Sequence, residues 1–196
     1  MNIPIIYEDD WLQVVNKPSG LLVIHTPRNE KRTLTSILGI HPCHRLDRET
    51  SGLIIYAKGK SIQKKMMDEF KQKRVRKIYA AIVQGNLAHN EGRITYPIEN
   101  SSAVTKYKVI RRGKDFTLVE VMPLTGRTNQ IRIHFKNIGH PIVGERVYAF
   151  RKDFKLKARR LCLHAKELEF IHPVTKRKIH LDAGQDTYLQ EFLNTH

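Results

Sequence analysis

The stretch "HPCHRLDRETSGLIIYAK", from His41 to Lys58, places many polar and charged side chains directly before an apolar run. The run "LIIYA" is rich in β-branched and aromatic residues and follows a glycine, which predicts a buried strand. The preceding "DRETSG" has two interpretations. It is a solvated turn whose short polar side chains form local hydrogen bonds, or it holds Asp47 at the edge of a cleft for chemistry. These residues alone leave both interpretations open.

The composition predicts a folded protein of one domain, or of one domain with two lobes. The chain has 196 residues, 40% of them hydrophobic, which suffices for a substantial core. No apolar run approaches the roughly 20 residues that span a bilayer, and the N-terminus lacks the pattern of a secretory signal. Cys43 and Cys162 show no metal-binding spacing, and the sequence leaves one disulfide between them open. We expect a reduced, cytoplasmic protein with no membrane partner.

The charge points to a polyanionic partner. Lys and Arg number 35 against 19 Asp and Glu, a net charge of +16. Such an excess favours nucleic acid, because basic side chains that neutralise phosphates release counterions. The alternative is a soluble basic protein without such a partner. The basic residues gather in four stretches: Lys71–Lys77, Lys106–Lys114, Arg151–Arg160 and Thr175–Lys178.

Hydrophobic patterning predicts an α+β fold with several hairpins and about three helices. Predicted strands cover 13–24 as strand, Pro/Gly turn and strand, 51–58, 76–85, both sides of "RRGKD" at 111–115, 161–173 and 176–183. Predicted helices cover 61–73, 125–141 and 187–194. In the first helix Ser61 is the expected N-cap, and Ile62, Met66 and Phe70 form an apolar stripe for the core. In the second, Arg132 lies about 100° from the apolar Ile131 and could reach inward.

Several classes of site lack support in the sequence. The ten histidines show no HExxH pattern and no spacing joined to cysteine or carboxylate ligands, so we expect no metal site. Neither GxxxxGK[ST] nor GxGxxG occurs, so we expect no nucleotide cofactor, and a GxSxG nucleophile elbow is also absent. What remains is Asp47 between Arg45 and Arg48. Nearby positive charge favours the ionised carboxylate, which could act as a nucleophile, a base or a salt-bridge partner.

Five ordered motifs resemble the RluA-type pseudouridine synthases, a family that isomerises uridine in RNA. "HRLDRETSG" resembles the catalytic motif H-R-L-D-x-x-T-S-G of that family. "VVNKPSGLLV" resembles its opening strand-turn-strand, and "RKIYAAIVQG" its K-x-Y-x-A-x-V-x-G motif. "GRTNQIRIH", continued by "GHPIVGERVY", and the late "LHAKELEFIHP" resemble the remaining two. Together the motifs cover nearly the whole chain in the order that the family has them.

The resemblance implies the pseudouridine synthase fold, with a mixed, largely antiparallel sheet in two lobes, flanking helices and a central catalytic cleft. It implies that residues 1–196 form one catalytic domain without an N-terminal accessory RNA-binding domain. It also implies a cytoplasmic, monomeric enzyme that needs no cofactor, since the reaction is an isomerisation. The expected substrate is a stem-loop of transfer RNA or ribosomal RNA.

The resemblance also assigns roles to residues. Asp47 is the catalytic carboxylate, acting as nucleophile or as base. Tyr79 packs on the target base, and Arg132 pairs with Asp47. Arg45 enters the RNA where the uridine leaves the stack, because a stacked base shields the reacting atoms. Three further candidates contact RNA or orient the site: His44, Arg127 and Gln130.

Departures from the family pattern limit what can be transferred. Asn129 stands where the family usually has His, and Glu145 where it usually has Asp; we expect neither to touch the three catalytic candidates. The segment 97–107 is shorter than the RNA-contacting loop that the family commonly has there. Two alternatives remain: a non-catalytic RNA-binding or RNA-folding protein on the same scaffold, and a glycosylase or nuclease that uses a carboxylate.

Overall fold

The strand expected after the polar stretch is β4 (Ser51–Ala57), and all seven of its residues are buried. In the computed structural model, which describes residues 2–26, 32–149 and 155–196, β4 lies between two other strands. The chain divides into two compact units, and each unit is formed by two separate segments of the chain. The first unit contains residues 1–77 and 165–184, and the second contains 78–164 and 185–196.

The first unit is built on a set of paired strands with β4 near their centre. The order is β1 (Ile5–Glu8), β2 (Leu12–Lys17), β4 and β9 (Leu163–Ile171), with β3 (His41–Pro42) paired to β4 and β10 (Lys178–Asp182) paired to β9. The helices are α1 (Leu34–Leu38) and α2 (Lys60–Lys71). Met66 of α2 is fully buried in this unit's core with Leu12, Leu53 and Phe170, which confirms the apolar stripe predicted for that helix.

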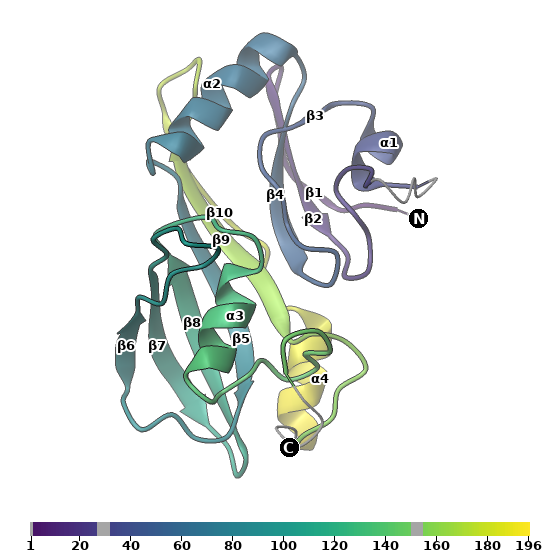
Figure 1. Cartoon of the computed structure of the whole chain (residues 1–196). Helices are drawn as coiled ribbons and strands as arrows, with labels where there is room; N and C mark the ends of the chain where they lie inside the picture. The colour runs from purple at the N-terminus through teal and green to yellow at the C-terminus, as the bar shows by residue number, and fades with distance from the viewer. Residues whose placement is uncertain (1, 27–31, 150–154) are drawn as a thin grey trace. The chain divides into compact units, whose positions relative to one another are not determined.

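The second unit has its own antiparallel strands and core. The order is β5 (Arg76–Gln84), β8 (Phe116–Pro123), β7 (Thr105–Arg112) and β6 (Glu91–Ile94), with helices α3 (Gln130–Asn137) and α4 (Thr187–Thr195). Figure 1 shows α3 lying across the strands of this unit, and the Phe135 ring of α3 lies 5.7 Å from the Tyr107 ring of β7. Helix α3 ends as predicted, with Gly139 in the left-handed region just after it.

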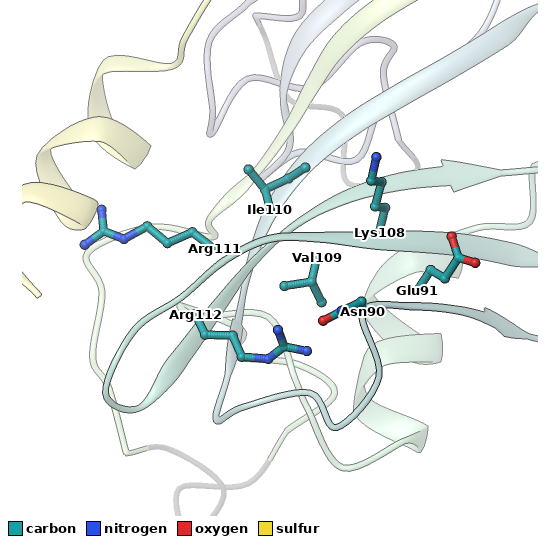
Figure 2. Close-up of a pocket in the computed structure, with 7 residues that line it drawn as sticks. All are labelled: Asn90, Glu91, Lys108, Val109, Ile110, Arg111 and Arg112. Carbon is teal, nitrogen blue, oxygen red and sulfur yellow. The ribbon is translucent and has the colours of Figure 1, made fainter.

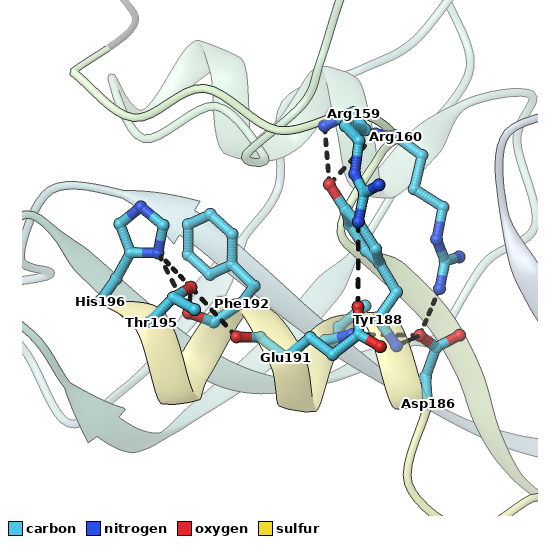
Figure 3. Close-up of polar contacts among 9 residues, drawn as sticks. Arg159, Arg160, Asp186, Tyr188, Glu191, Phe192, Thr195 and His196 are labelled. Carbon is cyan, nitrogen blue, oxygen red and sulfur yellow. Dashed lines mark hydrogen bonds and ion pairs between the residues drawn. The ribbon is translucent and has the colours of Figure 1, made fainter.

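The N-terminus of α4 is fixed by a polar cluster. The Asp186 carboxylate accepts hydrogen bonds from the backbone N–H groups of Tyr188 (3.0 Å) and Leu189 (3.1 Å) and pairs with Arg160. The Tyr188 hydroxyl oxygen accepts from the Arg159 backbone N–H at 2.6 Å (Figure 3). An aspartate at this position satisfies helix N–H groups that have no partner within the helix. The cluster therefore explains why the predicted C-terminal helix begins where it does.

The sequence predictions of individual elements were wrong in four places. The helix predicted over 125–141 begins only at Gln130, after a non-helical segment at 125–129. Residues 21–24 form no strand, because the carbonyl groups of Leu22 and Val23 accept hydrogen bonds from the first residues of α1, Leu34 (2.7 Å) and Thr35 (3.0 Å). Helix α2 has Gly59 as its N-cap instead of Ser61. The short elements β1, β3, β6 and α1 were not predicted, since two to five residues carry too little periodicity.

Candidate active site

Asp47 lies in the loop between β3 and β4, and a buried lysine fixes that loop. Lys17, at the end of β2, is fully buried. Its ammonium group donates to the carbonyl oxygens of Leu21 (2.8 Å), Pro18 (3.0 Å) and Arg48 (3.1 Å). The last of these carbonyls belongs to the residue directly after Asp47. Lys17 thus ties the loop that follows β2 to the loop that carries the carboxylate.

Further hydrogen bonds join the same two loops. The Ser19 hydroxyl donates to the Glu49 carbonyl at 2.6 Å, and the Gly20 N–H donates to the Arg48 carbonyl at 2.8 Å. The Thr50 N–H donates to the Asp47 carbonyl at 3.2 Å, closing a turn. Both interpretations of "DRETSG" are therefore compatible with the structure, since the segment is a hydrogen-bonded turn and Asp47 itself is half-buried rather than enclosed.

At position 52, the last residue of "TSG", close packing requires glycine. Gly52 has φ +116°, and a Cβ atom there would lie 2.3 Å from the backbone oxygen of Ala165 on β9. Any side chain would force the two strands apart. The sequence "TSG" thus continues the loop into β4 at a fixed distance from β9.

His44 anchors the start of the loop to β4. Its Nε2 atom accepts a hydrogen bond from the Ile55 N–H at 3.0 Å, and its ring lies 4.5 Å from the ring of Phe70. An accepting Nε2 requires the neutral tautomer with the proton on Nδ1. Burial and the nearby Lys77 ammonium group lower the pKa of His44 to about 3. The sequence suggested that His44 either contacts RNA or orients the site, and these contacts support the orienting role.

Because His44 is neutral in the fold, we expect acid to destabilise the protein through this residue. The pKa of His44 in the folded protein, about 3, lies below the ordinary value of 6.5. Between these two pH values, His44 therefore binds a proton in the unfolded chain but not in the folded one. The contribution is present above about pH 6.5 and is lost as the pH falls toward 3. Urea unfolding at pH 7.5 and at pH 4.5 measures it. His44→Gln, whose amide oxygen can still accept from Ile55, should show a smaller loss between these pH values; an equal loss would contradict the assignment.

In the second unit, Arg132 of α3 is held by a buried carboxylate. Its guanidinium donates from Nε to Glu145 Oε2 and from Nη2 to Glu145 Oε1, both at 2.7 Å. Nη1 donates to Asn129 Oδ1 at 3.0 Å. Arg132 is 4% exposed and the Glu145 side chain is fully buried. The inward position predicted for Arg132 is confirmed, and Glu145 and Asn129 account for three of the five N–H groups of its guanidinium.

Further contacts surround Arg132, Asn129 and Glu145. The Tyr148 ring lies 5.1 Å below the Arg132 guanidinium, and the Tyr148 hydroxyl accepts from Asn129 Nδ2 at 2.7 Å. Glu145 Oε1 also accepts from the backbone N–H of Val147 at 2.8 Å. Burial by itself would raise the pKa of Glu145, but the bonds from Arg132 and from backbone N–H groups outweigh it and hold that pKa below its ordinary value. The carboxylate is therefore ionised and the pair is charged at neutral pH.

Tyr79 lies on the side of the sheet that α3 covers. On β5, Tyr79 is directly opposite Val121 of β8, which is in turn opposite Tyr107 of β7. Residues opposite one another in antiparallel strands share a face, and the Tyr107 ring packs near Phe135 of α3. Tyr79 is half-buried against this core. Both catalytic candidates of the second unit, Tyr79 and Arg132, thus belong to the helix side of its sheet.

Gln130 is used fully inside the fold. Its Oε1 atom accepts from the Thr125 hydroxyl (2.7 Å) and from the Arg127 N–H (3.0 Å). Its Nε2 atom donates to the Val104 carbonyl (3.0 Å) and the Thr105 hydroxyl (2.9 Å). Gln130 is 4% exposed. These contacts favour an orienting role for Gln130 over the contact with RNA that the sequence also allowed.

Arg127 and Arg45 are the exposed members of the predicted RNA-binding set. Arg127 donates from Nε to the Ser102 carbonyl at 3.2 Å, next to the short segment that replaces the family's longer loop. That segment turns at Glu99 (φ 48°) and Asn100 (φ 57°), which occupy the left-handed region typical of a tight hairpin. Arg45 is exposed on the Asp47 loop. In the basic stretch Arg151–Arg160, residues 151–154 lie outside the described residues.

Comparison with known proteins gives the family. The profile described as RNA pseudouridylate synthase matches residues 12–137, which include β2, the Asp47 loop, Tyr79 and Arg132. The chain belongs to the RNA pseudouridylate synthase family. A dual-specificity RNA pseudouridine synthase RluA from Haemophilus influenzae is 36% identical to it, over 94% of each chain. A tRNA pseudouridine synthase C from the same organism is 34% identical, over 98% of this chain and 97% of the relative.

Solved structures agree on the fold. Human RNA pseudouridylate synthase domain containing 1 superposes with a TM-score of 0.81 at 26% identity, covering 97% of this chain and 86% of that one. The expected α+β pseudouridine synthase fold and the RNA-modifying isomerase class are therefore confirmed. The single-domain organisation and the pairing of Asp47 with Arg132, which concerns residues of the two units, stay predictions.

One expectation about this pseudouridylate synthase was wrong. Asn129 and Glu145, the two departures from the family pattern, were expected not to touch a catalytic candidate, yet both bond directly to Arg132. The reason is geometric. Asn129 precedes α3 by one residue and so lies beside the first helical turn, and the segment after α3 folds back to bring Glu145 there. The departures therefore sit at a catalytic candidate.

Sequence reasoning also missed Lys17 as part of the site. A signal existed in the sequence, since Lys17 stands two residues after Val15 and therefore shares its face if both belong to one strand. The sequence interpretation treated "NKPSG" only as a turn.

Cys43 and Cys162 are both free and buried, and burial raises the pKa of each thiol to about 12. No disulfide joins these two described residues.

Two negative findings concern only the residues that the structure describes. Within 2–26, 32–149 and 155–196, no three His, Cys, Asp or Glu side chains gather as a metal site requires. Over the same ranges, no helix has the length and apolar character needed to cross a membrane.

Proposed function

We propose that this chain isomerises uridine to pseudouridine in transfer RNA, large-subunit ribosomal RNA or both, with Asp47 as the catalytic carboxylate. The observation that carries the proposal is the fixed position of the Asp47 loop, in a family member that retains the motif around it. Lys17, Ser19 and Gly20 hold the backbone on the C-terminal side of Asp47. Fixed positioning is what a reacting carboxylate needs, because small misplacements cost large factors in rate.

The chemistry assigned to the site balances without a redox partner. The bond between ribose C1′ and base N1 breaks, and a bond between C1′ and C5 of the same base forms. The proton at C5 leaves and N1 gains one. The Asp47 carboxylate acts as nucleophile or base in this exchange, and Tyr79 packs against the base and assists removal of the C5 proton. Arg132, which Glu145 and Asn129 hold in place, acts as a second charge partner of the Asp47 carboxylate.

The substrate assignment rests on exposed residues and on relatives. Arg45 is exposed on the Asp47 loop, which suits an arginine that enters the stack when the uridine is extruded. The net charge of +16 favours RNA in general. The name of the RluA relative describes two specificities, and that of the other relative describes transfer RNA. We propose a cytoplasmic monomer that recognises a stem-loop.

The experiment that tests this function follows the proton at C5. Purified protein is incubated with RNA transcripts that carry tritium at C5 of uridine, and with matched transcripts that carry it at C6. Isomerisation releases tritium to water only from C5, and digestion of the RNA then yields pseudouridine. Release of free uracil or cleavage of the strand would instead support a glycosylase or a nuclease. A protein that binds both transcripts and releases no tritium would support the non-catalytic alternative.

A further inference from the structure

The second unit carries four cations on one side of its sheet that the catalytic description does not use. They are Arg93 of β6 and Lys106, Lys108 and Arg111 of β7, and all four are exposed. We propose that this set, the β7 basic face, binds the phosphate backbone of the RNA substrate at a second contact, away from the residues that act on the uridine. The inference rests on RNA being the substrate, as proposed above.

Strand register places these four residues on a common face. Arg93 is directly opposite Lys106, and Lys108 is directly opposite Glu120 of β8. Arg111 is opposite Leu118, two residues before Glu120 on β8 and hence on the same side of that strand. Because opposite residues in antiparallel strands share a face, the four cations form one continuous row over β6 and β7.

A β-bulge in β7 is responsible for the position of Arg111. Val109 pairs with Val119 and Arg111 pairs with Leu118, so Ile110 is an extra residue in the strand. Without it, simple alternation would turn residue 111 to the side of Val109, toward the core. Figure 2 shows Lys108 and Ile110 on one side of β7 and Val109 on the other. Bulges often redirect a side chain in this way at functional surfaces.

The charges of the face are only partly balanced within the protein, since Lys108 lies opposite Glu91 of β6 and Glu120 of β8. Arg93 and Lys106 are directly opposed, an arrangement of like charges that destabilises a sheet. The other neighbour of Lys106, on β8, is the uncharged Met122. Among the described residues, no carboxylate forms an ion pair with Arg93 or Lys106. A polyanion would remove the repulsion, which makes an RNA backbone the partner that fits.

The bulge also hollows the surface. A groove of about 510 Å³ lies between the start of β6 and the bulge, lined by Asn90, Glu91 and residues 108–112 of β7 (Figure 2). Ile110 is 55% exposed at this groove. An apolar side chain between cations suits a nucleic acid strand, because sugars and phosphates alternate along it. A flat acidic protein surface has no such alternation.

Protection of the sheet edge does not account for the row. Charged side chains on an edge strand block pairing with other chains, and β6 ends the strand order of this sheet. Only Arg93 lies on β6. Lys106 and Lys108 lie on the part of β7 that is paired on both sides, to β6 and to β8, and that has no free edge to protect. Arg111 lies beyond the end of β6 and pairs only with β8.

The position of the face makes a specific demand on the RNA. Tyr79 belongs to the α3 side of the sheet, through its register with Val121 and Tyr107, whereas the β7 basic face is on the opposite side. One RNA can reach both sides only if it passes around the edge strand β6 or around the ends of the strands. Contact with the β7 basic face therefore requires RNA beyond a short stem-loop.

The test compares two triple variants with the same change in charge. The first is Arg93→Gln, Lys106→Gln and Arg111→Gln, and the control is Lys60→Gln, Lys64→Gln and Lys65→Gln on the exposed side of α2. Binding of a fluorescein-labelled long transcript, and of a labelled short stem-loop cut from it, is measured by anisotropy at several salt concentrations. Tritium release is measured on a long transcript and on a short stem-loop cut from it.

We expect the β7 variant to bind the long RNA about tenfold more weakly, with the slope of log K against log salt reduced by about 2, since each lost phosphate contact removes about 0.7–0.9. KM should rise more for the long transcript than for the short one. The melting temperature of the β7 variant should stay the same or rise, because the like-charge pair of Arg93 and Lys106 is removed. If the β7 variant and the α2 control weaken RNA binding equally, the proposal is overturned. This holds even if the wild-type protein isomerises uridine in both RNAs, so that the proposed function stands.

Discussion

Replacing Glu145 with glutamine is expected to destabilise the fold by about 3–5 kcal/mol, because Arg132 would be left buried without its carboxylate. Two charge-assisted hydrogen bonds of 2.7 Å join these side chains, and neither side chain is more than 4% exposed. The same change should reduce tritium release by about 100-fold, since Arg132 would lose the partner that positions it. Urea unfolding and the tritium assay measure the two effects.

The matched control is Glu191→Gln. Glu191 lies 3.9 Å from Arg159, and both side chains are largely exposed. Exposed ion pairs contribute about 0–1 kcal/mol, so this control should lose little stability and no activity. If Glu145→Gln behaves like Glu191→Gln, the buried pair does not position Arg132.

A second comparison separates positioning from stability. The family usually has Asp at position 145 and His at position 129, and both residues here bond to Arg132. Glu145→Asp should place the carboxylate too far from the guanidinium and lower kcat. Adding Asn129→His should restore part of kcat if the two departures compensate one another. A double variant no better than Glu145→Asp alone would show that they are independent.

Replacing Lys17 with methionine should have the next largest effect, a loss of about 2–4 kcal/mol. Methionine fills a similar volume, but the Leu21 and Pro18 carbonyl groups would lose the Lys17 donor, and each buried unsatisfied group costs about 1–3 kcal/mol. The carbonyl of Arg48, beside Asp47, would lose the bond from Lys17 and keep the hydrogen bond from the Gly20 N–H. We therefore expect kcat to fall as the loop loosens, while KM changes little. Unfolding and single-turnover tritium release would measure both.

Lys58→Met is the control for Lys17. Lys58 is in the same unit and pairs with Glu8 at 2.8 Å, at a partly exposed position. It should cost at most about 1 kcal/mol and leave turnover unchanged. Wild-type turnover in Lys17→Met would contradict the role given to this lysine in holding the Asp47 loop.

The long elements were predictable because their patterns repeat. The strand β4 follows from one apolar run, and the α3 pattern was sufficient to place Arg132 beside the buried stripe. Periodicity does not specify what a buried polar side chain will contact. Arg132 meets Glu145 across 13 positions of sequence, and such a contact depends on how the chain folds back after α3.

The errors have a similar origin. Residues 21–24 are as apolar as a strand, but their carbonyl groups bond to α1, a helix of five residues too short to be predicted. Lys17 was overlooked because buried lysines are rare and a lysine before Pro reads as part of a turn. Its importance depends on three carbonyl groups, which only the folded chain brings together.

The central claim is that Asp47 carries out the chemistry, and the most direct test is tritium release from C5-labelled RNA by Asp47→Asn. Asparagine preserves the size of the side chain and removes its charge. Asp68→Asn, at an exposed position of α2, serves as the matched control. The account predicts no release above background by Asp47→Asn, with RNA binding and melting temperature close to wild type, and normal release by Asp68→Asn. Release by Asp47→Asn at the wild-type rate would contradict it.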